Sequence, residues 1–249
     1  MKHAALFATA ASLLPALTAS LAAAAPAIPS YISAAVADSA RPAEDTQRDA
    51  ERKPAETLAF AGVKPGDTVI EVAPGKGYYT RLLSAVVGAK GKVYAVGSQP
   101  KPDAPPPPVV AIAADPHYGN VTVSLQHIPD LKLPEGVDLV WTSQNYHDLH
   151  NIKELEVAKF DRAFFDALKR GGTYFVLDHA AEAGSGARDT STLHRIDEET
   201  VKQEVTAAGF KLVAESDILR NKSDAHTAKV FDPEIRGHTA QFLLKFKKP

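Results

Sequence analysis

The residues Thr68-Val69-Ile70-Glu71-Val72-Ala73-Pro74-Gly75-Lys76-Gly77 combine an apolar run with a glycine loop. The β-branched residues at the start of this run predict a short buried strand, and residues 79–87 after the loop predict a helix. In such a strand-loop-helix unit, glycines let a ligand approach the backbone N–H groups at the helix N-terminus. We therefore expect a ligand site at the carboxyl end of this strand, where open parallel sheets bind small molecules.

Strands and helices alternate along the rest of the chain. This alternation predicts an α/β fold with a doubly wound, mostly parallel seven-stranded sheet. The last two strands are joined by a long polar connection and are expected to add an antiparallel edge strand. The expected strands cover residues 68–72, 92–96, 121–125, 137–142, 173–177, 211–215 and 241–246, and the expected helices cover residues 42–61, 79–87, 109–113, 152–169 and 197–208.

The N-terminal residues predict export. Lys2 precedes an alanine- and leucine-rich run, Ala4 to Ala25, which ends in small residues that signal peptidase accepts. An uncleaved membrane anchor is the alternative, but the run is mostly alanine and is interrupted by Pro15, so we favour a signal peptide over residues 1–25 and a periplasmic or secreted protein. Residues 26–41 are expected to form a flexible tether, and residues 42–249 to fold as one domain.

The composition disfavours several classes of partner. The 249 residues carry a formal net charge of -2 with scattered basic side chains, which argues against nucleic acid. The chain has no cysteine, which excludes disulfides and thiol nucleophiles. We expect a small-molecule substrate and no stable membrane insertion once the signal is removed, and the sequence assigns no oligomeric state. Six prolines within residues 99–108 predict an extended surface loop.

Polar and titratable side chains follow the fourth and fifth expected strands. Asn145, His147 and Asp148 come after the fourth strand and His179 after the fifth, so all should lie at the same edge of the sheet. Imidazole titrates near neutrality, and His147 or His179 could remove a proton from a hydroxyl or amine, with Asp148 or Asp178 orienting the ring. Either histidine could instead only cap a helix, but several titratable groups at one ligand edge favour catalysis.

The glycine loop resembles motif I of the class I S-adenosylmethionine-dependent methyltransferases. A nicotinamide cofactor is disfavoured because Thr80 stands where a third small residue would be needed. Residues 137–142 resemble the fourth strand of the family and residues 171–177 its fifth. More narrowly, the chain resembles a group of exported bacterial predicted methyltransferases, through Arg52-Lys53-Pro54, Asn145-Tyr146-His147-Asp148-Leu149-His150, Asp178-His179 and His194-Arg195-Ile196-Asp197.

The resemblance implies S-adenosylmethionine as the cofactor and methyl transfer to an oxygen or nitrogen atom of a small molecule. It places the cofactor at Glu71, Ala73, Pro74, Gly75, Gly77, Tyr78, Ser98 and Asn145. Glu71 is expected to orient the loop and to face the amino acid part of the cofactor. Two positions depart from the family. Ala73 replaces a glycine, and the second strand ends at Ser98 and Gln99, without the acidic residue that usually holds the ribose.

Two other functions fit the same residues. The missing ribose carboxylate and the export signal are compatible with a non-catalytic ligand-binding protein on a methyltransferase scaffold. A metal-dependent hydrolase or metal binder could use a carboxylate together with His147, His150, His179 and His194. The spacing of these histidines is not a recognised zinc signature, and the sequence assigns no metal ligand.

For charged residues outside these motifs, the sequence favours structural roles over ligand binding. Arg48, Arg52 and Lys53 could cover the cofactor or bind an anionic substrate, but a solvated helix face is the favoured interpretation. Asp197 is expected near the start of a helix, where a carboxylate interacts well with the helix dipole. Arg195 is a secondary candidate for a substrate contact.

Overall fold

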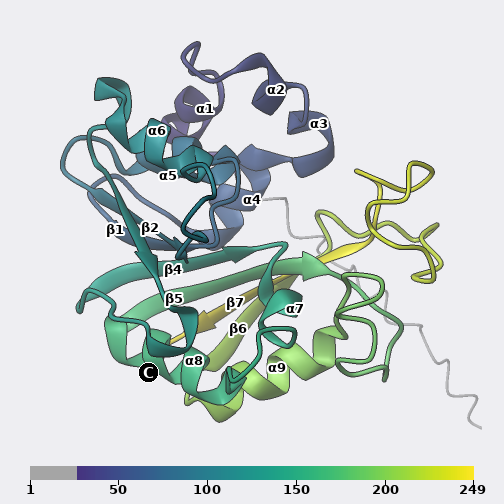
Figure 1. Cartoon of the computed structure of the whole chain (residues 1–249). Helices are drawn as coiled ribbons and strands as arrows, with labels where there is room; N and C mark the ends of the chain where they lie inside the picture. Colours follow the sequence, from purple (N-terminus) through teal and green to yellow (C-terminus); the bar gives the residue numbers. More distant parts are fainter. Residues whose placement is uncertain (1–26) are drawn as a thin grey trace, which may run out of the picture.

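A seven-stranded sheet lies at the centre of the computed structural model, which describes residues 27–249 (Figure 1). The strand order is β3-β2-β1-β4-β5-β7-β6, and β7 runs antiparallel to both of its neighbours while the other pairs are parallel. The expected α/β fold with an antiparallel addition at this edge is confirmed. The strands are β1 Thr68–Val72, β2 Lys92–Ser98, β3 Val121–Gln126, β4 Val137–Ser143, β5 Leu168–His179, β6 Lys211–Ser216 and β7 Gln241–Lys247.

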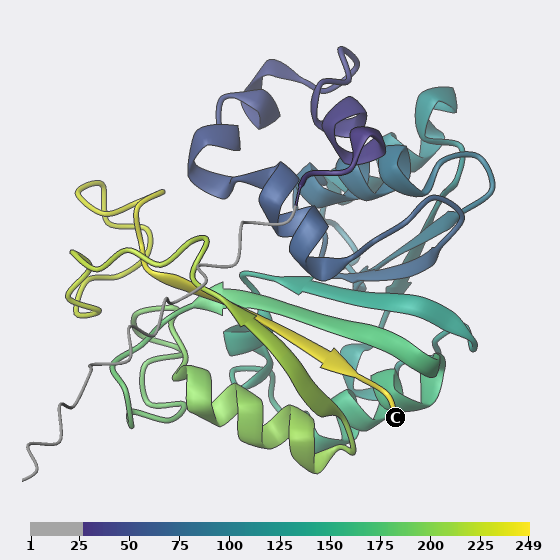
Figure 2. The ribbon, with the colours of Figure 1, turned by 180° about the vertical axis from the view of Figure 1, so that it is seen from behind.

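Helices cover both faces of the sheet. The helices α1, α4, α5 and α6 lie on one face, and α8 and α9 lie on the other (Figures 1 and 2). Two short helices, α2 and α3, connect α1 to α4, and α7 directly follows β4. The bounds are α1 Ser30–Val36, α2 Ala43–Thr46, α3 Asp49–Arg52, α4 Pro54–Ala61, α5 Tyr78–Val87, α6 Pro108–Ala114, α7 Tyr146–Leu149, α8 Val157–Ala167 and α9 Glu198–Ala207.

Two apolar layers hold the helices against the sheet, because successive strand residues point to opposite faces. Val69, Leu139 and Trp141 pack in the layer with α4 and α5, whereas Ile70 and Val140 pack in the layer with α8 and α9. Each of these five side chains is at most 2% exposed. Full burial of an aliphatic side chain stabilises a fold by about 1.5–3 kcal/mol, so the central strands carry much of the stability.

The N-terminal part of the described chain is packed against the core. Residues 26–41 were expected to form a flexible tether, but α1 buries Ile32 and Ala35 in the layer that contains α4 and α5. The prediction of a tether was wrong over these residues, because the apolar face of α1 is hidden among prolines, serines and alanines. The expected signal peptide, residues 1–25, lies outside the described residues. Within residues 27–249, no helix has both the length and the apolar character needed to cross a membrane.

Two expected helices are shorter in the structure. The single helix expected over residues 42–61 is divided into α2, α3 and α4, and Lys53 between α3 and α4 has a φ of 42°. Pro54 explains this break, because proline disfavours a helical conformation in the residue before it and is well suited to the first turn of a helix. The helix expected over residues 152–169 is α8, which begins at Val157 and is followed by β5 from Leu168.

A long loop, residues 217–240, joins β6 to β7 and projects beyond the carboxyl end of β5 (Figure 2). A buried ion pair anchors it, since the Arg195 guanidinium donates to both carboxylate oxygens of Asp224, at 2.8 and 3.1 Å. Arg195 also donates to the carbonyl oxygen of Ala180. Because the Arg195 side chain is fully buried and bonds to Asp224, it holds the loop, and the secondary interpretation of Arg195 as a substrate contact is not supported.

The buried ion pair gives a prediction of stability. We expect Asp224→Ala to lower the free energy of unfolding by about 3–5 kcal/mol, because Arg195 would keep its charge in the interior without a partner. Urea unfolding followed by circular dichroism measures this change. The exposed pair Glu156–Lys159 supplies the control, and Glu156→Ala should change the free energy of unfolding by less than about 0.5 kcal/mol. Equal effects of the two substitutions would contradict the prediction.

Candidate functional site

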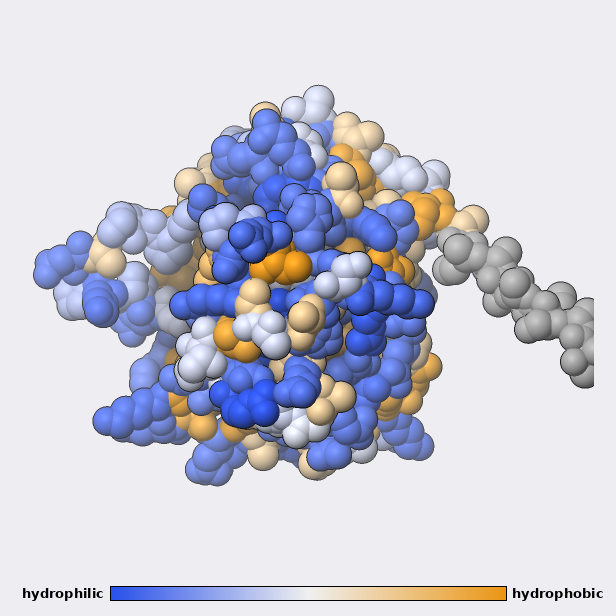
Figure 3. Space-filling view, turned by 90° about the vertical axis from the view of Figure 1, so that its right-hand side faces the viewer, coloured by the Kyte–Doolittle hydropathy of each residue, from blue (hydrophilic) through white to orange (hydrophobic). Residues whose placement is uncertain are grey.

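The carboxyl ends of β1, β4 and β5 lie side by side, because these strands are parallel neighbours in the sheet. The segments that follow them are the glycine loop, α7 with its flanking residues, and the connection from β5 to α9. We call this edge the rim. Figure 3 views the molecule from the side to which β4 and β5 point in Figure 1, and the surface there is mainly hydrophilic.

The glycine loop is open to solvent in its first half. Ala73, Gly75 and Lys76 are exposed, and no heavy atom lies within 4 Å of the position that a Cβ on Gly75 would take. Ala73 has a φ of 48°, in the left-handed region that favours glycine. Glycine would adopt this conformation without a steric cost, whereas Ala73 adopts it at some cost.

Gly77 has a different environment from Gly75. Its φ is 82°, and a Cβ at this position would lie only 2.0 Å from Cδ1 of Ile112, a buried residue of α6. A glycine is required here because α6 packs directly against the start of α5. The sequence predicted a cofactor role for both glycines, but the structure leaves only Gly75 open to a ligand.

Glu71 is enclosed beneath the loop. Its carboxylate accepts a hydrogen bond of 2.5 Å from the hydroxyl of Thr80 and is only 2% exposed. Burial raises the pKa of Glu71 to about 7, although the bond from Thr80 opposes the rise. Glu71 therefore joins β1 to α5. Its carboxylate is buried and does not face the exposed side of the loop, where the amino acid part of the cofactor was expected.

Asn145 and Tyr78 support the loop through their polar atoms. The amide of Asn145 donates to the carbonyl oxygen of Val72 at 2.8 Å, which ties the end of β4 to the end of β1. The hydroxyl of Tyr78 donates to Asp49 of α3 at 2.7 Å, so the N-terminal helices close over one side of α5. Both residues were predicted to bind the cofactor, and in the structure their polar groups bond to Val72 and Asp49 of the chain itself.

Ser98 lies at the end of β2 and is exposed, as expected for a residue that contacts a ligand. It lines a hollow of about 190 Å³ with Gln99, Gln126 and Lys153 among other residues, and no carboxylate lines this hollow. The neutral side chains of Ser98 and Gln99 therefore stand at the end of β2, where the resemblance led us to look for an acidic residue. A larger hollow of about 1060 Å³ lies at the opposite edge of the sheet, against α1, and is remote from the rim.

A buried carboxylate orients His147. Asp178, at the end of β5, accepts hydrogen bonds from the backbone N–H of His147 at 2.7 Å and from its ring Nδ1 at 2.8 Å. Burial disfavours charge on the ring, but the adjacent Asp178 raises the pKa of His147. The Nδ1 hydrogen is held by Asp178, which leaves Nε2 as the free ring atom.

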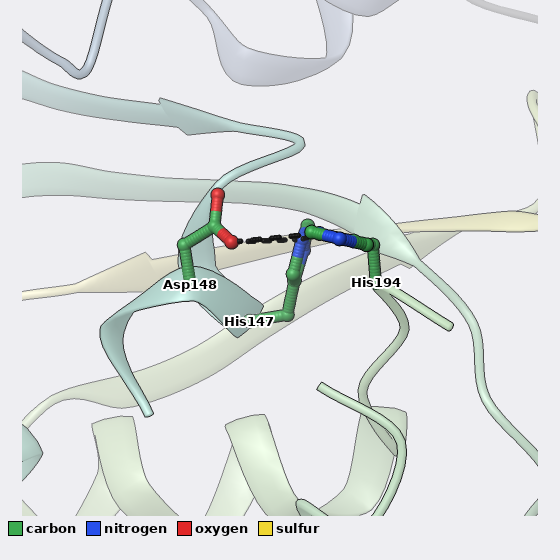
Figure 4. Close-up of side chains that lie close together, drawn as sticks. All are labelled: His147, Asp148 and His194. Atoms are coloured by element: carbon green, nitrogen blue, oxygen red, sulfur yellow. Dashed lines mark hydrogen bonds and ion pairs between the residues drawn. The ribbon is translucent and has the colours of Figure 1, made fainter. Parts of the chain in front are cut away.

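The free Nε2 atom of His147 faces two more polar side chains (Figure 4). It lies 3.4 Å from a carboxylate oxygen of Asp148 and 3.3 Å from Nδ1 of His194, and the latter two atoms are 3.6 Å apart. We call these three residues the histidine cluster. Asp148 or Asp178 was expected to orient the ring; Asp178 does so for His147, and Asp148 lies on the opposite side of the His147 ring.

His179 lies beside the cluster and faces another direction. Its Nδ1 is 2.8 Å from the hydroxyl of Thr239, and its ring centre is 6.3 Å from that of His147. Burial lowers the pKa of His179 to about 4, which makes it a neutral imidazole at physiological pH. His179 lines a pocket of about 100 Å³ together with Arg48, Arg52 and Phe231 among other residues.

Arg52 also belongs to the rim. It donates a 2.6 Å hydrogen bond to Gln144 directly after β4, and its guanidinium lies 4.5 Å from the centre of the Tyr78 ring. The interpretation of Arg52 as part of a solvated helix face was therefore wrong.

Of the other histidines in these segments, His150 bonds to Glu204 and does not join the histidine cluster. His194 was predicted only as an additional metal ligand, and its position depends on the folding of the connection after β5.

Solved structures share the fold of this chain. An S-adenosylmethionine-dependent methyltransferase from Aquifex aeolicus matches with a TM-score of 0.60 and 21% identity, over 84% of this chain and 99% of that chain. The chain has the class I methyltransferase fold. A cyclase shares this methyltransferase fold, with a TM-score of 0.57 and 19% identity over 83% of this chain and 81% of its own. A protein from Bordetella parapertussis, described as a possible exported protein, matches with a TM-score of 0.51 and 16% identity over 82% and 67%.

Sequence comparisons do not assign the chain to a family. No protein-family model matches the chain, and no curated protein matches it. At the identities of the solved structures, the likeness establishes the fold, and function has to be argued from the site.

The raised pKa of Glu71 gives a prediction of pH dependence. Between pH 4.5 and 7 the folded chain binds a proton at Glu71 more readily than the unfolded chain, so this residue's contribution to stability is lost as the pH rises. The amide side chain introduced by Glu71→Gln cannot ionise. We expect the free energy of unfolding of the native chain, relative to Glu71→Gln, to fall by roughly 2–3 kcal/mol between pH 5 and pH 8.

Urea unfolding of both proteins at the two pH values measures this difference. Exposed Glu156 supplies the control, and Glu156→Gln should leave the pH dependence of the native chain unchanged. A pH-independent difference between the native chain and Glu71→Gln would show that Glu71 is ionised throughout and is not enclosed.

Proposed function

We propose that this protein transfers a methyl group from S-adenosylmethionine to an oxygen or nitrogen atom of a small-molecule acceptor. The fold alone does not determine this reaction, since a cyclase has the same fold. The proposal is supported by one arrangement at the rim. An exposed backbone loop with open space at Gly75 follows β1, and a histidine whose orientation is fixed by a buried carboxylate follows β4, the neighbouring parallel strand.

Several residues at the rim suit the cofactor. The exposed backbone at Ala73, Gly75 and Lys76 would contact its amino acid part, and the hollow beside Ser98 and Gln99 would hold its nucleoside by neutral hydrogen bonds. When bound, S-adenosylmethionine supplies the methyl group, activated by a positively charged sulfur. A hydrogen bond to a charged group contributes about 1.5–3 kcal/mol, and we therefore expect weaker cofactor binding than in enzymes with an acidic residue at the end of β2.

The acceptor would lie between the cofactor loop and the pocket lined by His179. His147 is the predicted base, because Asp178 holds its Nδ1 and directs Nε2 toward Asp148 and His194. His179 stays neutral and can hydrogen-bond to the acceptor, while Arg52 and Gln144 form the wall opposite. Methyl transfer to a hydroxyl or amine releases one proton, and the histidine cluster is the group at the rim that can receive it.

Cofactor binding is the direct test of this proposal. We expect the purified chain to bind S-adenosylmethionine and S-adenosylhomocysteine with a Kd in the micromolar range, measured by calorimetric titration. Gly75→Val should weaken binding at least tenfold, because its side chain would fill the open space at the loop. Gly136→Val is the matched control, since Gly136 also has a positive φ and no neighbouring atoms but lies away from the rim.

Turnover separates the enzyme from the alternative of a non-catalytic binding protein. Release of S-adenosylhomocysteine in the presence of a panel of phenols, amines and carboxylic acids should slow by about 10²- to 10⁴-fold in His147→Asn. His150→Asn, on the same segment but outside the cluster, should keep the native rate. Binding of the cofactor without turnover would favour the binding protein, and failure to bind it below millimolar concentration would refute the proposal.

We also propose that the protein is exported. The alanine- and leucine-rich residues 1–25 support it, and one protein of the same fold is described as a possible exported protein. We expect the chain, expressed in a bacterium with two membranes, to appear in the periplasm with a new N-terminus close to Ala25. Deletion of residues 4–25 should leave it in the cytoplasm. Fractionation with N-terminal sequencing measures both, and an uncleaved chain in the cytoplasmic or membrane fraction would contradict export.

A further inference from the structure

The three atoms of the histidine cluster converge on one point (Figure 4). Nε2 of His147, Nδ1 of His194 and one carboxylate oxygen of Asp148 are separated by 3.3, 3.4 and 3.6 Å. All three atoms carry lone pairs when the imidazoles are neutral and the carboxylate is ionised. Two imidazole nitrogens and a carboxylate oxygen form a ligand set that catalytic zinc sites use, with a fourth position left open.

The separations between these atoms favour a four-coordinate ion. At bond lengths of about 2.0–2.1 Å, the ligand atoms of a tetrahedral zinc ion lie about 3.3–3.4 Å apart. Neighbouring ligand atoms of an octahedral magnesium ion with the same bond lengths lie only about 2.9–3.0 Å apart. The spacing in the cluster therefore corresponds to one face of a tetrahedron.

Asp178 has the position of an outer carboxylate. Histidines that bind metals usually donate their other ring N–H to a carboxylate or carbonyl oxygen, which fixes the tautomer and the direction of the lone pair. Asp178 accepts this bond from Nδ1 of His147 and is itself fully buried at the end of β5. It therefore holds His147 in the tautomer whose Nε2 lone pair points to the centre of the cluster.

The charges at this point are also suited to a cation. Asp148 and Asp178 bring two carboxylates to the site, and within residues 27–249 neither forms an ion pair with lysine or arginine. Their nearest basic partners are the imidazoles of the cluster. A divalent cation would balance the two negative charges and leave both histidines neutral.

His194 lies in the connection between β5 and α9, and contacts of the neighbouring residues hold it in place. His194 has a φ of 56°, a conformation that costs free energy for any residue except glycine. Arg195, the next residue, forms the buried ion pair with Asp224, and the ring of Phe231 packs against the imidazole at 4.8 Å. The chain thus keeps His194 in a strained position that brings Nδ1 to the cluster.

We propose that His147, Asp148 and His194 bind one divalent transition-metal ion, with zinc favoured by the ligand geometry and Asp178 orienting His147. The open fourth position faces the rim. This site goes beyond the proposed methyl transfer and does not depend on it. Its role in turnover rests on that proposal: a bound ion would occupy the Nε2 lone pair of His147, so His147 would no longer act as the base, and an acceptor atom bound at the fourth position would instead lose its proton more readily to solvent.

Zinc alone is the probe for this site. The full chain, purified without a histidine tag and stripped with a chelator, is titrated with zinc chloride in a calorimeter. We expect one zinc ion per chain with a Kd below about 1 μM. Asp148→Asn and His194→Asn should each weaken binding at least tenfold, and both positions are sufficiently exposed to tolerate the change. Asp178→Asn should weaken binding by about 10- to 100-fold, as is usual for an outer carboxylate.

His150→Asn is the matched control, because His150 is three residues from His147 and bonds to Glu204 outside the cluster. It should bind zinc as the native chain does. Cobalt in place of zinc should give the visible absorption of a four-coordinate ion, lost in His194→Asn. Circular dichroism of every variant checks the fold. Stoichiometric binding that is unchanged in Asp148→Asn and His194→Asn, or no binding below millimolar zinc, would overturn the proposal.

The test is independent of the methyltransferase proposal. If zinc does not bind but S-adenosylmethionine does, the metal site is refuted and the proposed function stands. If zinc binds with the expected variant pattern and the cofactor does not, the proposed function is refuted and the metal site stands.

Discussion

The parallel alignment of β1, β4 and β5 is the constraint on which the rim depends. Val72 pairs with Thr142, and Ser143 pairs with Leu177, so β4 ends one residue beyond β1, and β5 ends at His179, two residues beyond the end of β4. Two hydrogen bonds join these ends beyond the ladder, from Asn145 to the carbonyl oxygen of Val72 and from the backbone N–H of Gln144 to that of Leu177. The loops that leave the strands have to meet, whatever side chains they carry.

The fold could be predicted from the sequence where burial and chain geometry agree. The β-branched residues of β1 and β4 are buried on both sides, and their apolar runs are long enough to identify them. The N-terminal helices were harder to predict. The apolar face of α1 consists mainly of Ile32 and Ala35, which is too little contrast in an alanine-rich segment, and the break at Lys53 depends on the local effect of Pro54.

The candidate site could be predicted as a location but not as a set of contacts. The sequence placed Asn145, His147 and His179 at one edge because each follows a strand of a parallel sheet. It could not show that Asp178 bonds to His147 while His179 turns toward Thr239, since this choice depends on the side to which each residue points. The burial of Glu71 could not be predicted from the sequence either, because a carboxylate near the end of a strand can face either the loop or the helix that follows.

Three residues at the rim that are not glycine have a positive φ, namely Ala73, Gln144 and His194. Such a conformation costs about 1–2 kcal/mol for a residue with a Cβ, and glycine or asparagine would relieve most of it. A library of variants selected only for heat resistance should therefore accumulate glycine and asparagine at these three positions. The selected proteins would keep the sheet but lose the side chains of Gln144 and His194 from the rim. In this chain, greater thermal stability would therefore come at the expense of activity.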